Sequence, residues 1–187
     1  MGQGSVEIVR PYIVPFAPTG RRASRTERWR QALNALQGCF RRYYARRYDS
    51  IARSGERAGL AARRHELLTS AGGATVEIGA ATGLNIRHLS RLVSQLVLVE
   101  PDRHMLRQLS HRVGRIWPGA GVVRAVAEQL PFADATFDTA VVVFSLCSVA
   151  DQQAALREIA RVLVPGGRML FMEHVRSADP EVVATLV

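Results

Sequence analysis

Residues 75–85 read Thr75-Val76-Glu77-Ile78-Gly79-Ala80-Ala81-Thr82-Gly83-Leu84-Asn85, and this stretch decides the fold. A β-branched and aliphatic run carries the carboxylate Glu77, and small residues then alternate at Gly79, Ala81 and Gly83. An amphipathic segment, residues 86–92, follows directly. This order predicts a strand, a tight glycine-rich turn and the start of a helix. Because such a turn lets the backbone approach a ligand closely, the stretch predicts a nucleotide-type binding loop.

A second carboxylate, Glu100, follows another aliphatic run at residues 96–99. It lies 100 − 77 = 23 residues beyond Glu77. In dinucleotide-binding folds an acidic residue about 20 residues beyond the glycine loop binds the ribose hydroxyls, so the spacing predicts this role for Glu100. The loop departs from the G-x-G-x-x-G pattern of NAD-binding proteins, because Leu84 occupies the position of the third glycine.

Four motifs in order carry a resemblance to a known family. The loop pattern E-x-G-x-A-x-G resembles the first motif of class I S-adenosylmethionine-dependent methyltransferases, and Glu100 follows it at the expected spacing. Residues 127–138 resemble the family's A-E-x-L-P-F-x-D-x-x-F-D stretch, and residues 161–168 resemble its R-V-L-x-P-G-G turn. The resemblance covers roughly residues 41–178. It implies a methyltransferase that takes its methyl group from S-adenosylmethionine.

Within this family the chain resembles the type 11, small-molecule branch that includes quinone C-methyltransferases. Residues 145–149 and 171–176 are similar to the methyltransferase-like alkyl thiol methyltransferases of that branch. The resemblance implies a small, lipophilic acceptor and leaves its acceptor atom open between oxygen, carbon and sulfur. A non-catalytic or truncated module of the same fold, acting as a partner subunit, is the alternative.

The resemblance also implies which residues bind the cofactor. They are Glu77, Gly79, Ala80, Ala81, Gly83, Glu100, Pro101, Ala127, Glu128, Phe144, Ser145 and Tyr48. Glu77 would lie close to the methionine ammonium, with capping of its own turn as the alternative. Ala127 and Glu128 would meet the adenine edge. Tyr48 would lie over the cofactor as part of a lid, with plain helix packing as an equal alternative.

Catalysis of methyl transfer needs alignment of the acceptor and, for a weak nucleophile, removal of its proton. His174 is the candidate base because it follows the fifth predicted strand, at the edge where open α/β sheets bind ligands. Cys147 and Glu173 are alternatives, and a structural role for His174 is also open. No metal ligands are predicted, because Cys39 and Cys147 show no metal spacing.

Length and composition limit the class of protein to which the chain can belong. The 187 residues suit one domain, and 48% hydrophobic content fits a globular chain. No apolar run reaches the length of a membrane span, and the first residues make a poor secretion signal. The two cysteines predict free, buried or half-buried thiols in a reducing compartment. Together these features predict a cytoplasmic location.

The net charge of +9 comes from arginine alone, and 14 of the 25 arginines lie in residues 1–65. Nucleic-acid binding is not expected, because no aromatic-interleaved basic ribbon accompanies the charge. The asymmetry instead predicts a solvated helix face or a contact with an anionic membrane surface.

Three segments are expected along the chain. Residues 1–23 form an irregular or disordered arm, residues 24–69 form a helical lid and substrate wall, and residues 70–187 form the cofactor-binding core. A capping box at residues 24–27 should begin a helix that Gly38 ends or interrupts. The core alternates strands and helices, which predicts a Rossmann-like, doubly wound and mostly parallel sheet with helices on both faces.

The family's C-terminal antiparallel edge hairpin is not expected, since 14 residues follow Glu173. An uncovered edge at the fifth strand, residues 168–173, favours pairing with another strand. The partner could be residues 6–14 or a second copy of the chain, which would give a homo-oligomer.

Overall fold

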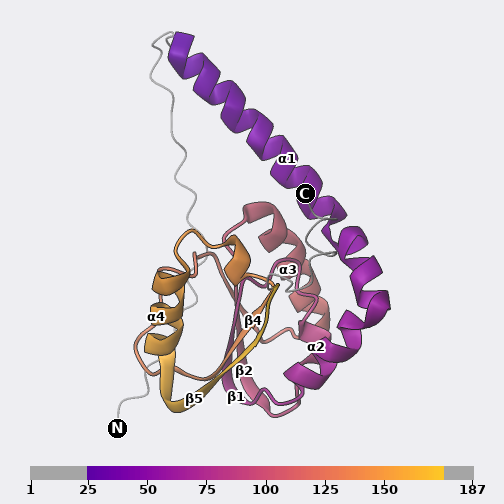
Figure 1. Ribbon diagram of the computed structural model, residues 1–187, viewed down its shortest axis with the longest axis vertical. Helices are drawn as coiled ribbons and strands as arrows, with labels where there is room; N and C mark the ends of the chain where they lie inside the picture. The colour runs from indigo at the N-terminus through magenta and orange to yellow at the C-terminus, as the bar shows by residue number, and fades with distance from the viewer. Residues whose placement is uncertain (1–24, 175–187) are drawn as a thin grey trace, which may run out of the picture. The chain divides into compact units, whose positions relative to one another are not determined.

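The structure is a computed structural model that describes residues 25–174, with side chains from Gly38 onward (Figure 1). Its core is a five-stranded sheet in the order β3-β2-β1-β4-β5, and every neighbouring pair is parallel. The strands are β1 (Gly73–Ile78), β2 (Val93–Val99), β3 (Gly121–Val123), β4 (Phe137–Val143) and β5 (Leu163–Met172). The predicted parallel, Rossmann-like sheet is confirmed.

The centre of the sheet determines where a ligand can bind. In β1, Glu77 pairs with Leu98 of β2 on one side and with Val141 of β4 on the other. The chain moves outward through β2 and β3 and then crosses back to β4, so the strand order reverses between β1 and β4. Open α/β sheets bind ligands at the carboxyl ends of the strands at this reversal. The turn after β1 is therefore the expected site.

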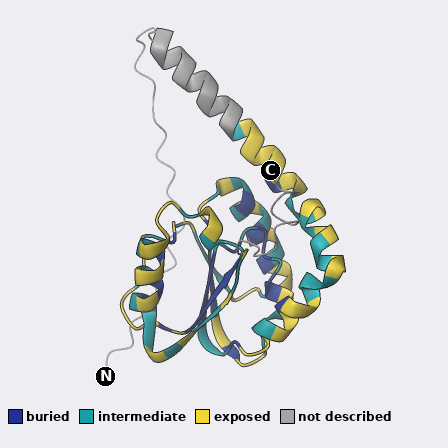
Figure 2. Cartoon of the chain, viewed as in Figure 1, coloured by how far each residue is buried: buried dark blue, intermediate teal, exposed yellow. Residues whose placement is uncertain are grey.

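Helices cover both faces of the sheet. The helical elements are α1 (Arg25–Gly55), the π-helical turn η1 (Glu56–Leu60), α2 (Ala61–Leu68), the single turns η2 (Ile86–His88) and η3 (Leu146–Ser148), α3 (Arg103–Ile116) and α4 (Gln152–Val162). Ile159 of α4 packs with Val76 on one face, whereas Leu109 of α3 packs with Leu98 on the other. Figure 2 shows the result, with buried strands between helices whose outer faces are exposed. The sheet is doubly wound, as predicted.

Two helices begin at aspartate caps. The Asp102 side chain accepts hydrogen bonds from the backbone N–H groups of His104 and Met105 at the start of α3. Asp151 accepts one from the N–H of Ala154 at the start of α4. Such caps satisfy donors that have no partner within the helix.

The segment after the glycine loop corrects a prediction. The expected helix over residues 85–92 is only the single turn η2, and Leu89 is already extended. Ile86 and Leu89 pack into the core, and the N–H of Ser90 donates to the carbonyl of Leu68 at 3.3 Å. Tertiary contacts therefore turn the chain toward β2 after one helical turn.

The N-terminal helices also differ from expectation. Helix α1 begins at Arg25, as the capping box predicts, but runs through Gly38 without interruption. The break comes later, at Gly59, whose φ of 114° lies outside the helical region. The side chains of residues 24–37, the arm 1–23 and its suggested pairing segment 6–14 lie outside the described part. No described helix is long and apolar enough to cross a membrane.

Strand β5 forms one edge of the described sheet. Within residues 25–174, β5 is the outer strand and pairs with β4 alone, and Phe171 on it is 60% exposed. Homo-oligomerisation through this edge stays a prediction.

The prediction that Cys39 and Cys147 are buried or half-buried is wrong, because both are exposed.

Candidate functional site

A cavity of about 840 Å³ lies at the carboxyl ends of β1, β2 and β4, at the reversal of strand order. Its walls hold ten of the residues predicted from the sequence: Tyr48, Gly79, Ala81, Glu100, Pro101, Ala127, Glu128, Phe144, Ser145 and His174. Three predicted residues, Glu77, Ala80 and Gly83, do not line it. Ala80 and Gly83 belong to the loop but are buried.

The glycine loop needs its small residues for steric reasons. Gly79 has a φ of 72°, and a Cβ there would lie 2.3 Å from Cβ of Ser145. Gly83 has a φ of 83°, and a Cβ there would meet Ile86 and Leu109. Ala81 adopts a φ of 47°, a region that non-glycine residues rarely enter. The loop is held in this form because Ser145 Oγ donates to the carbonyl of Ile78 at 3.0 Å.

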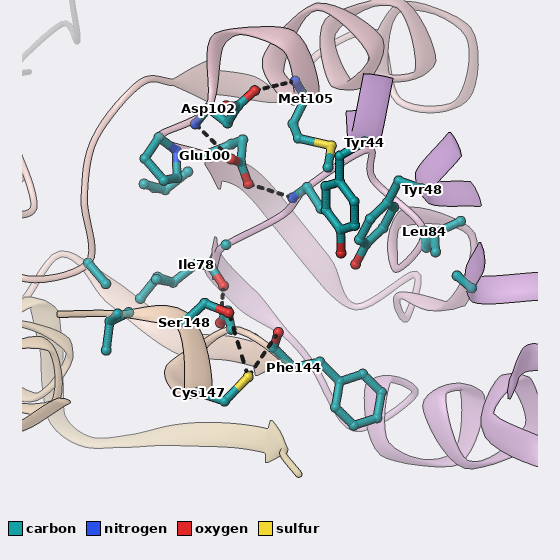
Figure 3. A pocket seen from close by; sticks show the side chains of 18 of the residues that line it. Tyr44, Tyr48, Ile78, Leu84, Glu100, Asp102, Met105, Phe144, Cys147 and Ser148 are labelled. Carbon is teal, nitrogen blue, oxygen red and sulfur yellow. Dashed lines mark hydrogen bonds between the residues drawn. The ribbon is translucent and has the colours of Figure 1, made fainter. Parts of the chain in front are cut away.

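Glu100 joins the glycine loop to the start of α3 (Figure 3). Its Oε2 accepts the backbone N–H of Ala81, and its Oε1 accepts that of Asp102, each at 2.8 Å. Burial raises the pKa of Glu100, and these two hydrogen bonds oppose the shift. Each carboxylate oxygen retains a lone pair that can accept a hydroxyl hydrogen. The carboxylate is thus held in place on the cavity wall and can still accept hydrogen bonds from the two hydroxyl groups of a diol.

Glu77 lies beneath the loop and is 1% exposed. Its Oε1 accepts from Nδ2 of Asn85 at 2.7 Å, whereas Oε2 is buried with no hydrogen-bond partner among the described residues. Burial raises the pKa of Glu77 to about 7. The buried Arg64 donates to Oδ1 of Asn85 and pairs with Glu56 at 2.7 Å. The chain of contacts from Glu56 to Glu77 therefore ties the N-terminal helices to the loop.

Sequence reasoning missed this network. Arg64 lies among other arginines of the N-terminal helices, and arginines are usually exposed. Only its position four residues before the buried Leu68 indicates that it lies on the buried face of the helix. Asn85 directly follows the loop, but nothing in the chain marks it as a partner of Arg64, which lies 21 residues away.

Helix α1 contributes the wall opposite the loop. Tyr48 and Tyr44 face the cavity side by side, with ring centroids 5.8 Å apart (Figure 3). Burial raises the pKa of Tyr48. The neighbouring Asp49 accepts a hydrogen bond from Oγ1 of Thr82 at 2.6 Å and pairs with Arg112 of α3. Asp49 therefore fastens this part of α1 over the glycine loop.

The opposite end of the cavity is built from β4, β5 and η3. Phe144, at the end of β4, has a φ of 54°, and its ring stacks on that of His174 at 4.4 Å between centroids. Glu173 Oε1 accepts the N–H groups of Ser145 and Leu146, each at 2.7 Å. The three residues that the sequence offered as alternatives for catalysis, namely Cys147, Glu173 and His174, therefore gather at one place.

Glu128 and Ala127 close the remaining side. Glu128 Oε1 accepts the N–H groups of Ala150 and Asp151 at 2.8 and 3.3 Å. Backbone hydrogen bonds to the carboxylate hold its pKa below the ordinary value. Glu128 thus connects its loop to the start of α4, and Ala127 packs into the core beside the cavity.

The sequence of this chain is similar to that of known methyltransferases. The methyltransferase domain family matches residues 76–171. A ubiquinone/menaquinone biosynthesis C-methyltransferase from Hahella chejuensis is 38% identical over 118 residues, covering 59% of this chain and 46% of its own. A demethylmenaquinone methyltransferase from Corynebacterium kroppenstedtii is 38% identical over 112 residues, covering 60% and 46%. The chain spans about half the length of these relatives.

Solved structures agree on the fold. The YcgJ protein of Bacillus subtilis superposes with a TM-score of 0.59 at 25% identity, over 66% of this chain and 56% of that one. A methyltransferase from Methanococcus maripaludis described as S-adenosyl-L-methionine-dependent gives 0.60 at 19% identity, over 71% and 63%. The matched family spans the sheet from β1 to β5 with the glycine loop and Glu100. The chain belongs to the methyltransferase domain family, in its class I, S-adenosylmethionine-dependent group.

Proposed function

We propose that this chain binds S-adenosylmethionine in the cavity and transfers its methyl group to a small, lipophilic acceptor. The observation that carries the proposal is Glu100, a buried carboxylate on the wall of a cavity at the reversal of strand order. The N–H groups of Ala81 and Asp102 hold it in place. A volume of about 840 Å³ falls in the range of small-molecule sites.

The donor's parts match the cavity walls. Glu100 would accept the two ribose hydroxyls, and the backbone at Gly79 and Ala81 would approach the methionine end. The adenine would lie between Pro101 and the loop of Ala127 and Glu128. Tyr48 would cover the donor from α1, while Phe144 and Ser145 would lie toward the acceptor. Glu77 would act through Asn85 and the loop, because it does not reach the wall.

The acceptor proposed here is a quinone-type ring. Apolar side chains from several elements line the cavity, among them Ile51, Leu60, Leu84 and Phe144, and such walls suit a lipophilic molecule. The curated relatives are named for quinone biosynthesis, which supports a ring-carbon acceptor. A thiol is the second candidate, supported by the resemblance of residues 145–149 to thiol methyltransferases.

The protein's part in the chemistry is alignment and proton removal. The donor supplies an electrophilic methyl group, and the new bond to carbon or sulfur forms as the bond to the sulfonium breaks. His174 lies in the cavity wall with its ring oriented by Phe144, so a ring nitrogen can take the proton that the acceptor loses. No observation favours the non-catalytic alternative.

Calorimetric titration with S-adenosylmethionine and S-adenosylhomocysteine tests the proposal. Glu100→Ala should weaken binding by about 2–3 kcal/mol, because the charge-assisted hydrogen bonds to the ribose are lost. Glu66→Ala, which removes an exposed carboxylate of α2, should bind like the parent. Equal binding by parent and Glu100→Ala would contradict the assignment.

A further inference from the structure

Cys147, Glu173 and His174 form a cluster on the cavity wall that methyl-donor binding does not use. One potential ligand atom from each residue lies within 4.8 Å of the others. Sγ of Cys147 is 4.0 Å from Nδ1 of His174, and both residues line the cavity. Within residues 38–174, whose side chains the structure describes, this is the one such group of three or more metal-ligating side chains.

The spacing fits a bound zinc ion. Zinc binds cysteine sulfur at about 2.3 Å and histidine nitrogen at about 2.0–2.1 Å, so tetrahedral geometry places those two ligand atoms about 3.6 Å apart. The observed 4.0 Å between Cys147 Sγ and His174 Nδ1 needs only a small approach. A thiolate, an imidazole and a carboxylate are also a donor set that zinc accepts, whereas magnesium and calcium prefer oxygen alone.

The carboxylate is already oriented for such a role. Glu173 Oε1 is held by the N–H groups of Ser145 and Leu146, while Oε2 is buried and has no hydrogen-bond partner in the part of the chain that the structure describes. A buried carboxylate oxygen without a partner is costly, and a cation beside it would remove that cost. The stacking of His174 on Phe144 likewise fixes the imidazole, as outer contacts do for metal-binding histidines.

We propose that Cys147, Glu173 and His174 bind Zn²⁺ on the cavity wall and leave one coordination position open toward the cavity. Three protein ligands with one open position is the arrangement of catalytic rather than structural zinc sites. On binding, the Cys147 thiol loses its proton to solvent and gives up its weak contact with the carbonyl of Phe144, which is drawn in Figure 3.

The open position gives the site a function that rests on the proposed methyl transfer. A thiol, the second candidate acceptor, would coordinate there, release its proton to solvent and present a sulfur lone pair as a thiolate. That lone pair forms the new bond to the methyl carbon, and the sulfonium sulfur keeps the electrons of the bond that breaks. With zinc bound, Nδ1 of His174 is a ligand, so the metal replaces it in activating the acceptor.

The first experiment measures metal binding without turnover. The metal-free 187-residue chain is titrated with Zn²⁺ against a competing chelator, and with Co²⁺ while thiolate-to-cobalt absorption is recorded. Cys147→Ser should lower zinc affinity by at least about tenfold and abolish the thiolate band. Glu173→Gln and His174→Ala should also weaken binding. Cys39→Ser removes the other exposed thiol and should behave like the parent.

The outcomes separate this proposal from the methyltransferase assignment. Equal zinc affinity in the parent and Cys147→Ser, or a thiolate band lost only in Cys39→Ser, overturns the zinc site. Each variant is also titrated with S-adenosylhomocysteine, and unchanged binding shows that Cys147→Ser is folded. Zinc binding by a parent chain that fails to bind either adenosyl compound would leave the site standing and overturn the proposed function instead.

Discussion

Gly79 shows how one residue combines fold and binding. Its φ of 72° and the 2.3 Å approach to Cβ of Ser145 leave no room for a side chain. Gly79→Ala should therefore lower the free energy of unfolding by about 1–3 kcal/mol and weaken donor binding. Chemical denaturation checks the first effect, with Gly114→Ala as the control: a Cβ there meets nothing within 4 Å in helix α3, so stability should rise slightly. A stable Gly79→Ala would contradict the strain argument.

Glu77 predicts a specific pH dependence of stability. Its folded pKa of about 7 exceeds the ordinary 4.5, so the native chain holds this proton more tightly than the unfolded chain. The contribution to stability is complete below pH 4.5 and is lost as pH rises through about 7. Glu77→Gln keeps an acceptor for Asn85 and cannot ionise, so it should lose this pH dependence.

The variant should therefore gain stability relative to the parent above pH 7, by at most about 3 kcal/mol. Urea unfolding of both chains at pH 5 and pH 8 measures this difference. A parent and a variant that respond identically to pH would show that Glu77 does not titrate in this range.

At the scale of elements, α1 depends on Asp49 for its attachment to the core. Asp49 binds Thr82 of the glycine loop and Arg112 of α3, and Gln108 of α3 donates to the carbonyl of Ala45 at 2.6 Å. Asp49→Asn should release this part of α1, so amides at residues 43–52 should exchange hydrogen faster. Asp134→Asn removes the same charge from a side chain that is 78% exposed and pairs with Arg161, and it should leave that exchange unaltered. Equal exchange in both variants would contradict the attachment.

The elements also show where sequence reasoning worked and where it failed. The strands were predictable because each contains an apolar run, and β4 is buried along nearly its whole length. The fifth strand begins earlier than predicted, at Leu163, and includes the residues that were predicted to form a turn. The segment after β1 was wrongly predicted as a helix, because the spacing of its apolar residues suits one. In the structure the N–H of Ser90 donates to the carbonyl of Leu68 instead of continuing a helix. Gly38 did not interrupt α1, since a single glycine costs a helix only about 1 kcal/mol.

On the scale of the whole molecule, the arginines and exposed aromatic residues of α1 predict a contact with a membrane surface, where a lipophilic acceptor would be found. Phe40 and Tyr43 of α1 are 67% and 63% exposed, among closely spaced arginines. Aromatic and basic side chains on one helix favour an anionic membrane surface. We expect the chain to co-sediment with vesicles containing phosphatidylserine, and less so as salt rises.

A double variant, Phe40→Ser with Tyr43→Ser, should reduce this co-sedimentation while donor binding stays at the parent level. Neither residue lines the cavity, so the two measurements are independent. Binding to neutral and anionic vesicles alike, or none at all, would contradict the membrane contact.

The sequence by itself determined the parallel sheet, the glycine loop and the position of Glu100 relative to that loop. These features depend on local order and on spacing along the chain, which a single sequence displays. Only the tertiary structure showed that Arg64 donates to Asn85, which donates in turn to Glu77, and that Cys147 meets Glu173 and His174. The Arg64–Asn85 contact spans 21 residues and depends on how helix α2 packs beside the glycine loop. Cys147 and His174 are 27 residues apart, and they meet because the parallel strands β4 and β5 bring their carboxyl ends to one edge.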